Sequence, residues 1–165
     1  MTATISAIYT CARAGAPMQS HARIAVVAGE GLAGDRYAKG IGVYSRVEPI
    51  KVRHATLITQ DGIDTANAML RARGLVEFSA ADTRRNLVVV GMQAEELNDL
   101  VGREFSFGGI WFRGIEFSDP CHRPGRLLDR SGFEQAFERR GGLRAEVFSS
   151  GELIVGAIYS LERES

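Results

Sequence analysis

Cys121 stands in a short segment whose residue types favour thiol chemistry. The segment is Asp119-Pro-Cys-His-Arg-Pro-Gly125, in which two prolines bracket the cysteine and a histidine and an arginine follow it. Proline is poorly tolerated inside helices and central strands, so this pattern predicts a rigid loop. Cationic groups near a thiol favour the thiolate, which is the nucleophile and the ligand for soft metals. From the residues alone, Cys121 is either a reactive loop thiol or a small buried side chain in a turn.

Two further segments offer groups that suit an anion or a turn. Thr83-Arg-Arg-Asn86 comes directly before the apolar run Leu87–Val90. Two arginines and an asparagine at the start of a strand offer several donors to an anion, although a solvated charged turn has the same composition. Gly31-Leu-Ala-Gly-Asp-Arg36 is rich in glycine but matches neither the dinucleotide-binding nor the P-loop pattern. Gly34 is therefore expected to take a positive φ in a turn that the Asp35 carboxylate caps.

The remaining cysteine and the histidines give weaker indications. Cys11 lies in a β-type run and is expected to be a core thiol. Cys121 with His54 or His122 would permit thiol-dependent hydrolysis if a ring came within hydrogen-bonding reach, and no spacing in the sequence brings them together. The sequence has no CxxC pair and no Cys/His spacing typical of zinc fingers, so a structural zinc site is not expected.

The composition excludes several classes of protein. The 165 residues include 20 Lys+Arg and 20 Asp+Glu, so the formal net charge is zero, and 45% of them are hydrophobic. A neutral chain lacks the basic excess of a nucleic-acid binder, and this hydrophobicity excludes a disordered chain. No apolar stretch is long enough to span a membrane and no secretory signal is evident, so we expect a cytoplasmic protein with two free thiols. Only Lys39 and Lys51 among the basic residues are lysine, which reflects either a compositional bias or arginines that hold an oxyanion.

Short apolar runs separated by glycine-rich turns predict one mainly β domain, a barrel or sandwich, over residues 1–165. Apolar residues at helical spacing occur in Asp61–Arg73, where Asp61 is the expected N-cap and Gly74 the stop. A weaker helical pattern in Leu127–Arg140 places Leu128, Phe133, Ala136 and Phe137 on one face. The predicted strands are Thr4–Cys11, Arg23–Ala28, Val52–Thr59, Leu87–Val90, a hairpin over Phe105–Phe117 that turns at Gly108-Gly109, and a pair, Leu143–Phe148 and Leu153–Tyr159, that turns at Ser149–Gly151.

An ordered set of motifs across nearly the whole chain resembles the MOSC family, which is named for the C-terminal domain of molybdenum-cofactor sulfurases. The motifs are Gly15-Ala-Pro-Met18, Gly31-Leu-Ala-Gly-Asp-Arg-Tyr-Ala38, Thr83-Arg-Arg-Asn-Leu-Val88, Leu100-Val-Gly-Arg-Glu-Phe105, Asp119-Pro-Cys121, Gly142-Leu-Arg-Ala-Glu-Val147 and Gly151-Glu-Leu-Ile-Val-Gly156. The resemblance is to the short stand-alone bacterial members. It implies a mainly β, barrel-like fold with two or three short peripheral helices.

The resemblance also implies a site. The family has a loop thiol where Cys121 lies, which either carries a persulfide sulfur or binds the molybdenum of the molybdenum cofactor. By similarity, Arg84 and Asn86 would hold the pterin phosphate, with Arg36 and Ser20 as further anion contacts. Charge-assisted bonds to phosphate are roughly twice as strong as neutral ones, so we expect a positive pocket near Cys121.

The chain departs from its relatives at positions that bear on this site. Gln19 stands where relatives often have a lysine before the equivalent of Ser20, so that phosphate contact loses its charge. Ser118 stands where small members commonly have a second cysteine, so a disulfide within the loop is not expected. The chain has no room for the pyridoxal-phosphate desulfurase domain of the long sulfurases, so any persulfide would come from a separate cysteine desulfurase.

Two hypotheses from different classes follow. In the first, the chain binds the molybdenum cofactor (molybdopterin) or its sulfur through Cys121. It would act either as a small molybdenum-dependent reductase of N-hydroxylated compounds, with an electron-donor protein, or as a sulfur or cofactor carrier without turnover. In the second, the chain is a binding domain for an anion or a phosphate ligand and performs no chemistry. A small-molecule substrate is expected, and neither a nucleic acid nor a membrane is an expected partner.

Overall fold

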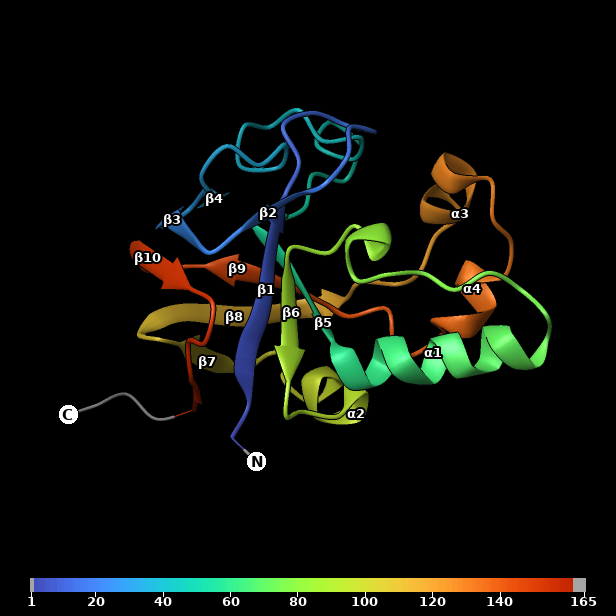
Figure 1. The fold of residues 1–165 in the computed structure, drawn as a ribbon. Helices are drawn as coiled ribbons and strands as arrows, with labels where there is room; N and C mark the ends of the chain where they lie inside the picture. Colours follow the sequence, from blue (N-terminus) through green and yellow to red (C-terminus); the bar gives the residue numbers. More distant parts are fainter. Residues whose placement is uncertain (1, 162–165) are drawn as a thin grey trace.

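The computed structural model describes residues 2–161, in which the predicted apolar runs form two sheets. The large sheet has eight strands in the order β11-β7-β8-β9-β5-β6-β1-β2, and the small sheet has three in the order β10-β3-β4. Figure 1 shows the large sheet curling into a half-barrel, so the prediction of a mainly β, barrel-like fold is confirmed. The strands are β1 (Thr4–Thr10), β2 (Gln19–His21), β3 (Arg23–Val27), β4 (Gly31–Leu32), β5 (Ala55–Thr59), β6 (Leu87–Val90), β7 (Glu104–Phe107), β8 (Ile110–Phe117), β9 (Leu143–Val147), β10 (Gly151–Ile154) and β11 (Tyr159–Ser160).

Strand β5 is buried on both faces and separates two apolar cores. Its Leu57 side chain packs inside the curled sheet, in the core that contains Phe112. The next residue, Ile58, faces the opposite side and packs in a second core with Leu70 and Phe133 from the helices. Strands β5 and β6 pair in parallel, which is typical of strands whose two faces are both covered. The other named strand pairs are antiparallel.

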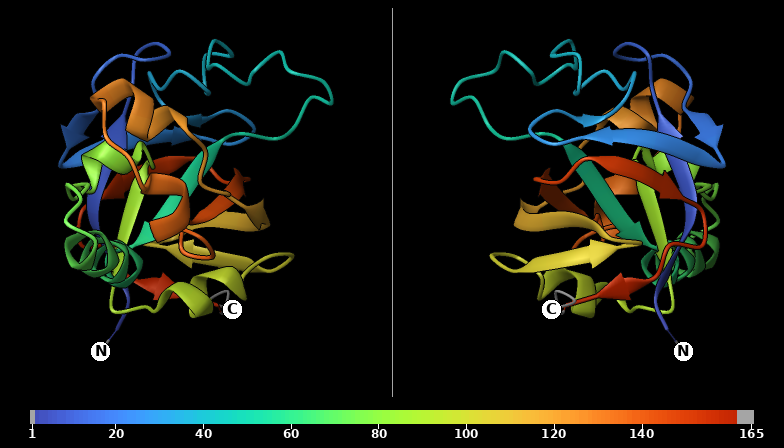
Figure 2. Two further views of the ribbon diagram at one scale, coloured as in Figure 1. Left: turned by 90° about the vertical axis from the view of Figure 1, so that its right-hand side faces the viewer. Right: turned by 90° about the vertical axis from the view of Figure 1, so that its left-hand side faces the viewer.

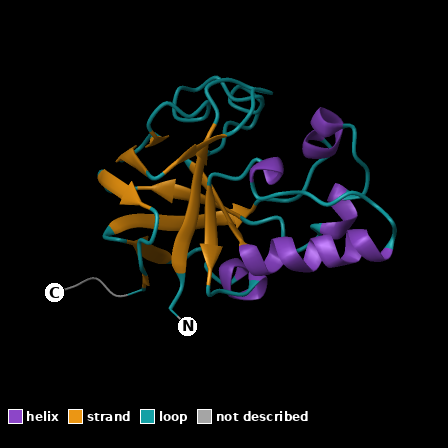
Figure 3. Cartoon of the chain, in the orientation of Figure 1, coloured by secondary structure: helices purple, strands orange, loops and turns teal. Residues whose placement is uncertain are grey.

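The helices gather on one side of the large sheet, as Figure 3 shows. Residues 2–161 contain four α-helices and one short 3₁₀ helix, η1, rather than the two or three helices expected. None of the helices within these residues is both long and apolar enough to cross a membrane. The helices are α1 (Gln60–Ala72), η1 (Ala81–Thr83), α2 (Ala94–Asn98), α3 (Arg123–Leu128) and α4 (Phe133–Ala136).

Helix α1 begins earlier than its sequence pattern suggests, and the prediction that Asp61 caps it is wrong. Thr59 is the N-cap, and its hydroxyl accepts a hydrogen bond from the backbone N–H of Gly62 at 3.0 Å. The Asp61 carboxylate instead accepts a hydrogen bond from the backbone N–H of Ala94, at the start of α2. Gly74 has a φ of 68° and follows the end of the helix, as predicted.

The helical pattern in Leu127–Arg140 is interrupted, so the single helix expected there is wrong. The chain forms α3 and α4 instead, because Asp129 and Gly132 between them have φ angles of 53° and 90°. Leu128 ends α3 and is exposed, whereas Phe133 and Phe137 are buried as the pattern predicts. Helix α3 begins at Arg123, two residues after Cys121.

The pairing expected between the last two predicted strands is also wrong. Strand β9 pairs with β5 and β8, whereas β10 leaves the large sheet and pairs with β3. The two serines between β9 and β10 fix this change of direction. The Ser149 hydroxyl accepts a hydrogen bond from the backbone N–H of Trp111 on β8, and the Ser150 hydroxyl accepts one from that of Ala28 after β3.

Candidate functional site

A pocket of about 250 Å³ lies at one end of the large sheet, where β5, β6 and β9 begin and β8 ends. The long loop between β4 and β5 arches over this end of the sheet, as Figure 2 shows, and contributes to the lining. Seven basic and two acidic side chains line the pocket, so a chain of zero net charge holds a local positive site, as expected. The charged lining residues are Arg36, Lys51, Arg53, Arg84, Arg85, Arg123, Arg144, Glu116 and Asp119.

The fold brings together four of the five residues expected at the site. Arg36, Arg84, Asn86 and Cys121 line the pocket although they come from three different parts of the chain. Ser20 does not line this pocket of the described chain: it lies exposed on β2, opposite Tyr9 of β1. The structure therefore offers no support for Ser20 as an anion contact in this arrangement, and that role stays a prediction.

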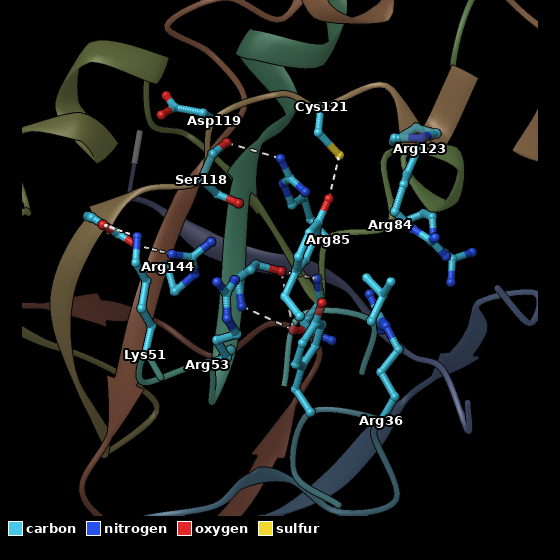
Figure 4. A pocket seen from close by; sticks show the side chains of 18 of the residues that line it. Arg36, Lys51, Arg53, Arg84, Arg85, Ser118, Asp119, Cys121, Arg123 and Arg144 are labelled. Carbon is cyan, nitrogen blue, oxygen red and sulfur yellow. Dashed lines mark hydrogen bonds and ion pairs between the residues drawn. The ribbon is translucent and has the colours of Figure 1, made fainter. Parts of the chain in front are cut away.

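Cys121 lies on the loop between β8 and α3, as the flanking prolines predict. Its side chain is partly exposed, and the Tyr44 hydroxyl donates a hydrogen bond to its sulfur over 3.7 Å. Burial, followed by the contact with Cys121, raises the pKa of Tyr44. Tyr44 belongs to the arching loop, so this contact joins that loop to the thiol. The dashed line that ends at the Cys121 sulfur in Figure 4 marks the contact.

Arg85 holds the cysteine loop in place. Its Nε donates a hydrogen bond to the Gly141 carbonyl at 2.7 Å, and an Nη donates one to the Ser118 carbonyl at 3.0 Å. The guanidinium thus links the turn before β9 to the loop that carries Cys121. Burial lowers the pKa of Arg85 to about 10, and the nearby Cys121 sulfur opposes this effect. The side chain therefore remains a cation at neutral pH.

Arg84 is held beside the pocket by groups of the N-terminal loop. Its φ is 63°, and its guanidinium donates hydrogen bonds to the Ala16 carbonyl at 2.9 Å and to the Cys11 sulfur at 3.4 Å. Burial, and then repulsion by Arg36, lowers the pKa of Arg84. Cys11 is fully buried, as predicted, and its thiol donates to the Arg13 carbonyl at 2.7 Å. The contact between this core thiol and Arg84 was not foreseen from the sequence.

A buried carboxylate, Asp35, organises the residues behind the pocket. One oxygen, Oδ1, accepts a hydrogen bond from the backbone N–H of Cys11 at 3.0 Å and forms an ion pair with Arg36 at 3.3 Å. The other oxygen accepts a hydrogen bond from the backbone N–H of Tyr37 at 3.2 Å. Gly34 has a φ of 80°, so both the turn and the capping carboxylate predicted for this segment are present. Asp35 therefore fixes the backbone from which Arg36 enters the pocket.

Asn86 contributes to the same buried network. Its Oδ1 accepts a hydrogen bond from the backbone N–H of Thr56 at 3.0 Å, and its Nδ2 donates to the Tyr9 carbonyl at 3.0 Å and to Asp35 Oδ1 at 3.4 Å. These bonds use both donors of the amide and link β1, β5 and β6. In this arrangement Asn86 positions the pocket wall, and its predicted direct contact with a phosphate stays untested.

Several residues of the pocket were not identified from the sequence. Arg53 and Arg144 stand near the starts of β5 and β9, which pair with each other, and Tyr44 lies on the arching loop. The Arg53 guanidinium lies 5.2 Å from the centre of the Tyr44 ring, in a cation–π contact. Arg53 lies in no motif, and Arg144 lies in the motif of residues 142–147, but only strand pairing brings the two together. Arg85 does have a local signal, since it follows Arg84 in the motif already singled out.

The histidines do not form a catalytic pair with Cys121. Within residues 2–161, no hydrogen bond joins a histidine to the Cys121 sulfur, and neither His54 nor His122 lines the pocket. His54 Nδ1 accepts a hydrogen bond from the backbone N–H of Val147 at 3.0 Å, and burial lowers the pKa of His54. The described part of the chain also has no cluster of three or more His, Cys, Asp or Glu side chains that could hold a metal ion.

The comparisons with known proteins concern the family and the fold. Residues 35–160 match the family model of the MOSC domain. The structure is similar to that of the YuaD protein from Bacillus subtilis, with a TM-score of 0.77 and 18% identity over 96% of this chain and 94% of that one. It is also similar to YiiM from Escherichia coli, with a TM-score of 0.63 and 17% identity over 100% of this chain and 71% of that one. YiiM from Geobacillus stearothermophilus gives a TM-score of 0.65 and 16% identity over 98% and 75% of the two chains. No curated protein matches the sequence.

Proposed function

The chain belongs to the MOSC domain family, and we propose that it binds the molybdenum cofactor, or sulfur destined for it, through Cys121 in the arginine-lined pocket. The single observation that carries this proposal is the position of Cys121 in a pocket with seven basic side chains. A thiolate is a soft metal ligand and a sulfur nucleophile, and guanidinium groups bind phosphate through paired hydrogen bonds. Both kinds of group are thus present within one cavity.

The residues fit this cofactor by the chemistry of their donor groups. Cys121 would contribute one sulfur, and Arg36 and Arg84 would bind the terminal phosphate. Asn86 and Asp35 would keep the backbone around those arginines fixed through the bonds between them. When bound, molybdenum would supply oxidation and reduction of a substrate. The chain's own contribution is to orient the phosphate, place the thiol and keep the arching loop over both.

The reductase and the carrier forms of this proposal differ in their partners. As a reductase of N-hydroxylated compounds, the protein would need a separate electron-donor protein. As a sulfur or cofactor carrier, it would receive sulfur from a separate cysteine desulfurase and hand it on from Cys121. The partly exposed Cys121 side chain suits either exchange with a second molecule. We place both activities in the cytoplasm, where thiols stay reduced.

Elemental analysis tests the proposal directly. The protein is expressed in a host that makes the molybdenum cofactor, and molybdenum and cyanide-labile sulfur are measured for the wild type, Cys121→Ser, Arg84→Gln and Arg103→Gln. We expect molybdenum or labile sulfur on the wild type, none on Cys121→Ser and less molybdenum on Arg84→Gln. Arg103 is exposed and does not line the pocket, so Arg103→Gln should match the wild type. A wild-type protein with neither molybdenum nor labile sulfur would contradict the proposal.

One observation favours the second candidate, an anion-binding domain that performs no chemistry. The pocket has a strong basic excess, while no histidine among residues 2–161 is bonded to Cys121 to act as an acid or a base. This candidate predicts that inorganic phosphate binds equally well to the wild type and to Cys121→Ser, and less well to Arg84→Gln. Isothermal titration calorimetry with phosphate measures all three. Loss of phosphate binding in Cys121→Ser would exclude the candidate.

A further inference from the structure

The carboxylates near the pocket neutralise only three of its seven cations. Glu116 forms ion pairs with Lys51, at 3.2 Å, and with Arg144. Asp119 adds a second negative charge near Arg144. Asp35 forms an ion pair with Arg36 at 3.3 Å. Within residues 2–161, the pocket arginines that have no carboxylate partner are Arg53, Arg84, Arg85 and Arg123.

The four arginines without a carboxylate partner carry more positive charge than the proposed phosphate and a Cys121 thiolate would neutralise. A phosphate monoester carries about −1.5 to −2 charges at neutral pH. A Cys121 thiolate adds one negative charge. About one positive charge in the pocket then remains without a counter-charge, which indicates a further anion.

The positions of the side chains show which of these four arginines a phosphate bound by Arg84 would leave without a counter-charge. In Figure 4, Arg36, Arg84 and Arg123 lie to one side of Cys121, and Arg53 lies on the other side together with Lys51 and Arg144. Arg85 stands between the two groups, with its guanidinium bonded to two carbonyls. A phosphate held by Arg84 therefore leaves Arg53 for another group.

Arg53 also has an unused hydrogen-bond donor. Its Nε is buried and has no partner, and no hydrogen bond or ion pair joins its guanidinium to another residue among 2–161. Buried donors in proteins are nearly always paired, so an unpaired one indicates a missing acceptor. The two terminal nitrogens of an arginine guanidinium can bind the two oxygens of a carboxylate together.

The contacts of Tyr44 connect this arginine to the thiol. The Tyr44 hydroxyl lies 3.7 Å from the Cys121 sulfur, and the Arg53 guanidinium lies 5.2 Å from the centre of the same ring. We propose that Arg53 binds the carboxylate of a small anionic substrate, whose other end then faces Cys121. This inference deepens the proposed function and rests on it, because it makes the Cys121 side of the pocket the place where the substrate reacts.

A pair of alkylating reagents tests the inference without any cofactor. Iodoacetate and iodoacetamide both alkylate a thiol with loss of iodide and have nearly the same size, but only iodoacetate carries a carboxylate. The rate of each at Cys121 is measured by peptide mass spectrometry, which counts Cys11 separately. We expect the ratio of the iodoacetate to the iodoacetamide rate to fall at least threefold in Arg53→Gln and by less in Arg53→Lys, which keeps the charge but loses the paired bonds. Arg103→Gln should leave the ratio unchanged.

Two results would overturn the inference. One is an unchanged ratio in Arg53→Gln, or in Arg53→Lys should the glutamine variant fail to fold. The other is an equal fall in Arg84→Gln, because the ratio would then report the general field of the pocket. The molybdenum content of the same variants distinguishes the two proposals. If the molybdenum content is normal but the ratio of alkylation rates is unchanged in Arg53→Gln, only the proposed carboxylate site at Arg53 is contradicted. If the ratio depends on Arg53 but the protein binds neither molybdenum nor labile sulfur, only the proposal of cofactor or sulfur binding is contradicted.

Discussion

The Tyr44 hydroxyl lies 3.7 Å from the Cys121 sulfur, so a residue of the arching loop contacts the thiol in the pocket. The loop between β4 and β5 contains no helix or strand, and a backbone hydrogen bond from the Arg36 N–H to the Cys11 carbonyl ties its start to the end of β1. Tyr44 makes two side-chain contacts, with Cys121 and with Arg53. The segment that contacts the thiol is therefore distant from it in sequence.

Removal of the Tyr44 ring should expose Cys121. We expect Tyr44→Ala to raise the rate of alkylation of Cys121 by the neutral reagent iodoacetamide severalfold, because the ring no longer covers the partly exposed sulfur. Tyr44→Phe keeps the ring and should stay closer to the wild type. Val47, an exposed residue of the same loop, provides the control, and Val47→Ala should not change the rate. Equal rates in the wild type and Tyr44→Ala would show that the ring does not shield the thiol.

Asp35 is expected to be the most sensitive buried residue near the site. Asp35→Asn removes a charge that pairs with Arg36 and places an amide donor among groups that all donate to the carboxylate. The loss of one partner of a buried ion pair costs about 3–5 kcal/mol, so we expect a loss of this order in the free energy of unfolding. Urea denaturation followed by circular dichroism measures it.

A second aspartate provides the matched control for this prediction. Asp82 forms an ion pair with Arg130 at 3.0 Å, but both side chains are partly exposed. Exposed and half-exposed pairs contribute about 0–1 kcal/mol, so Asp82→Asn should change the free energy of unfolding by no more than that amount. Similar losses in the two variants would contradict the central role that we assign to Asp35.

Arg85 should stabilise the cysteine loop more than the rest of the fold. A lysine in its place keeps a positive charge but cannot donate to the Gly141 and Ser118 carbonyls through two fixed nitrogens. We expect Arg85→Lys to lower the free energy of unfolding by about 1–3 kcal/mol, since a buried carbonyl loses its donor. Hydrogen–deuterium exchange should rise in residues 118–121 more than in α1. A uniform increase in exchange along the chain would contradict this role.

The sequence predicted the elements whose signals are local. The hairpin around Gly108-Gly109 forms as expected, because two adjacent glycines allow the tight turn between β7 and β8. The pairing of β10 was wrong because its partner, β3, lies at the other end of the chain, and no local pattern specifies it. The cap of α1 was misplaced by two residues, since Thr59 and Asp61 are both suitable N-cap residues.

The same distinction applies to the pocket. Arg36, Arg84 and Cys121 lie in motifs and were identified before their common pocket was known. Arg53 was missed because it has no motif of its own. Arg144 lies in the motif of residues 142–147 but was not assigned to the site, because only the antiparallel pairing of β5 with β9 brings it there. Ser20 was proposed from its equivalence to a position in relatives, just after the motif of residues 15–18, but the register of β2 against β1 leaves it exposed and outside the pocket.

His54 gives a prediction about pH. Its Nδ1 accepts a hydrogen bond from the backbone N–H of Val147 and can accept it only while that nitrogen carries no proton. Burial lowers the pKa of His54 below the usual value of 6.5, and the charge of Glu146 partly opposes this shift. As the pH falls through 6.5, the unfolded chain takes up a proton that the folded chain does not. The free energy of unfolding should therefore decrease from pH 6.5 down to the folded pKa, and the full contribution of His54 is present above pH 6.5.

Two variants isolate this contribution from the other acid-sensitive groups. In His54→Asn the side-chain oxygen can accept the same hydrogen bond but does not titrate, so the difference in unfolding free energy between pH 7.5 and pH 5.5 should be smaller than in the wild type. Glu146→Gln removes the opposing charge and should lower the pKa of His54 further, which NMR titration of the ring measures. Because burial is the larger cause, the pKa of His54 should stay below 6.5 in both the wild type and Glu146→Gln. If His54→Asn had the same pH dependence as the wild type, His54 would not be responsible for the loss of stability in acid.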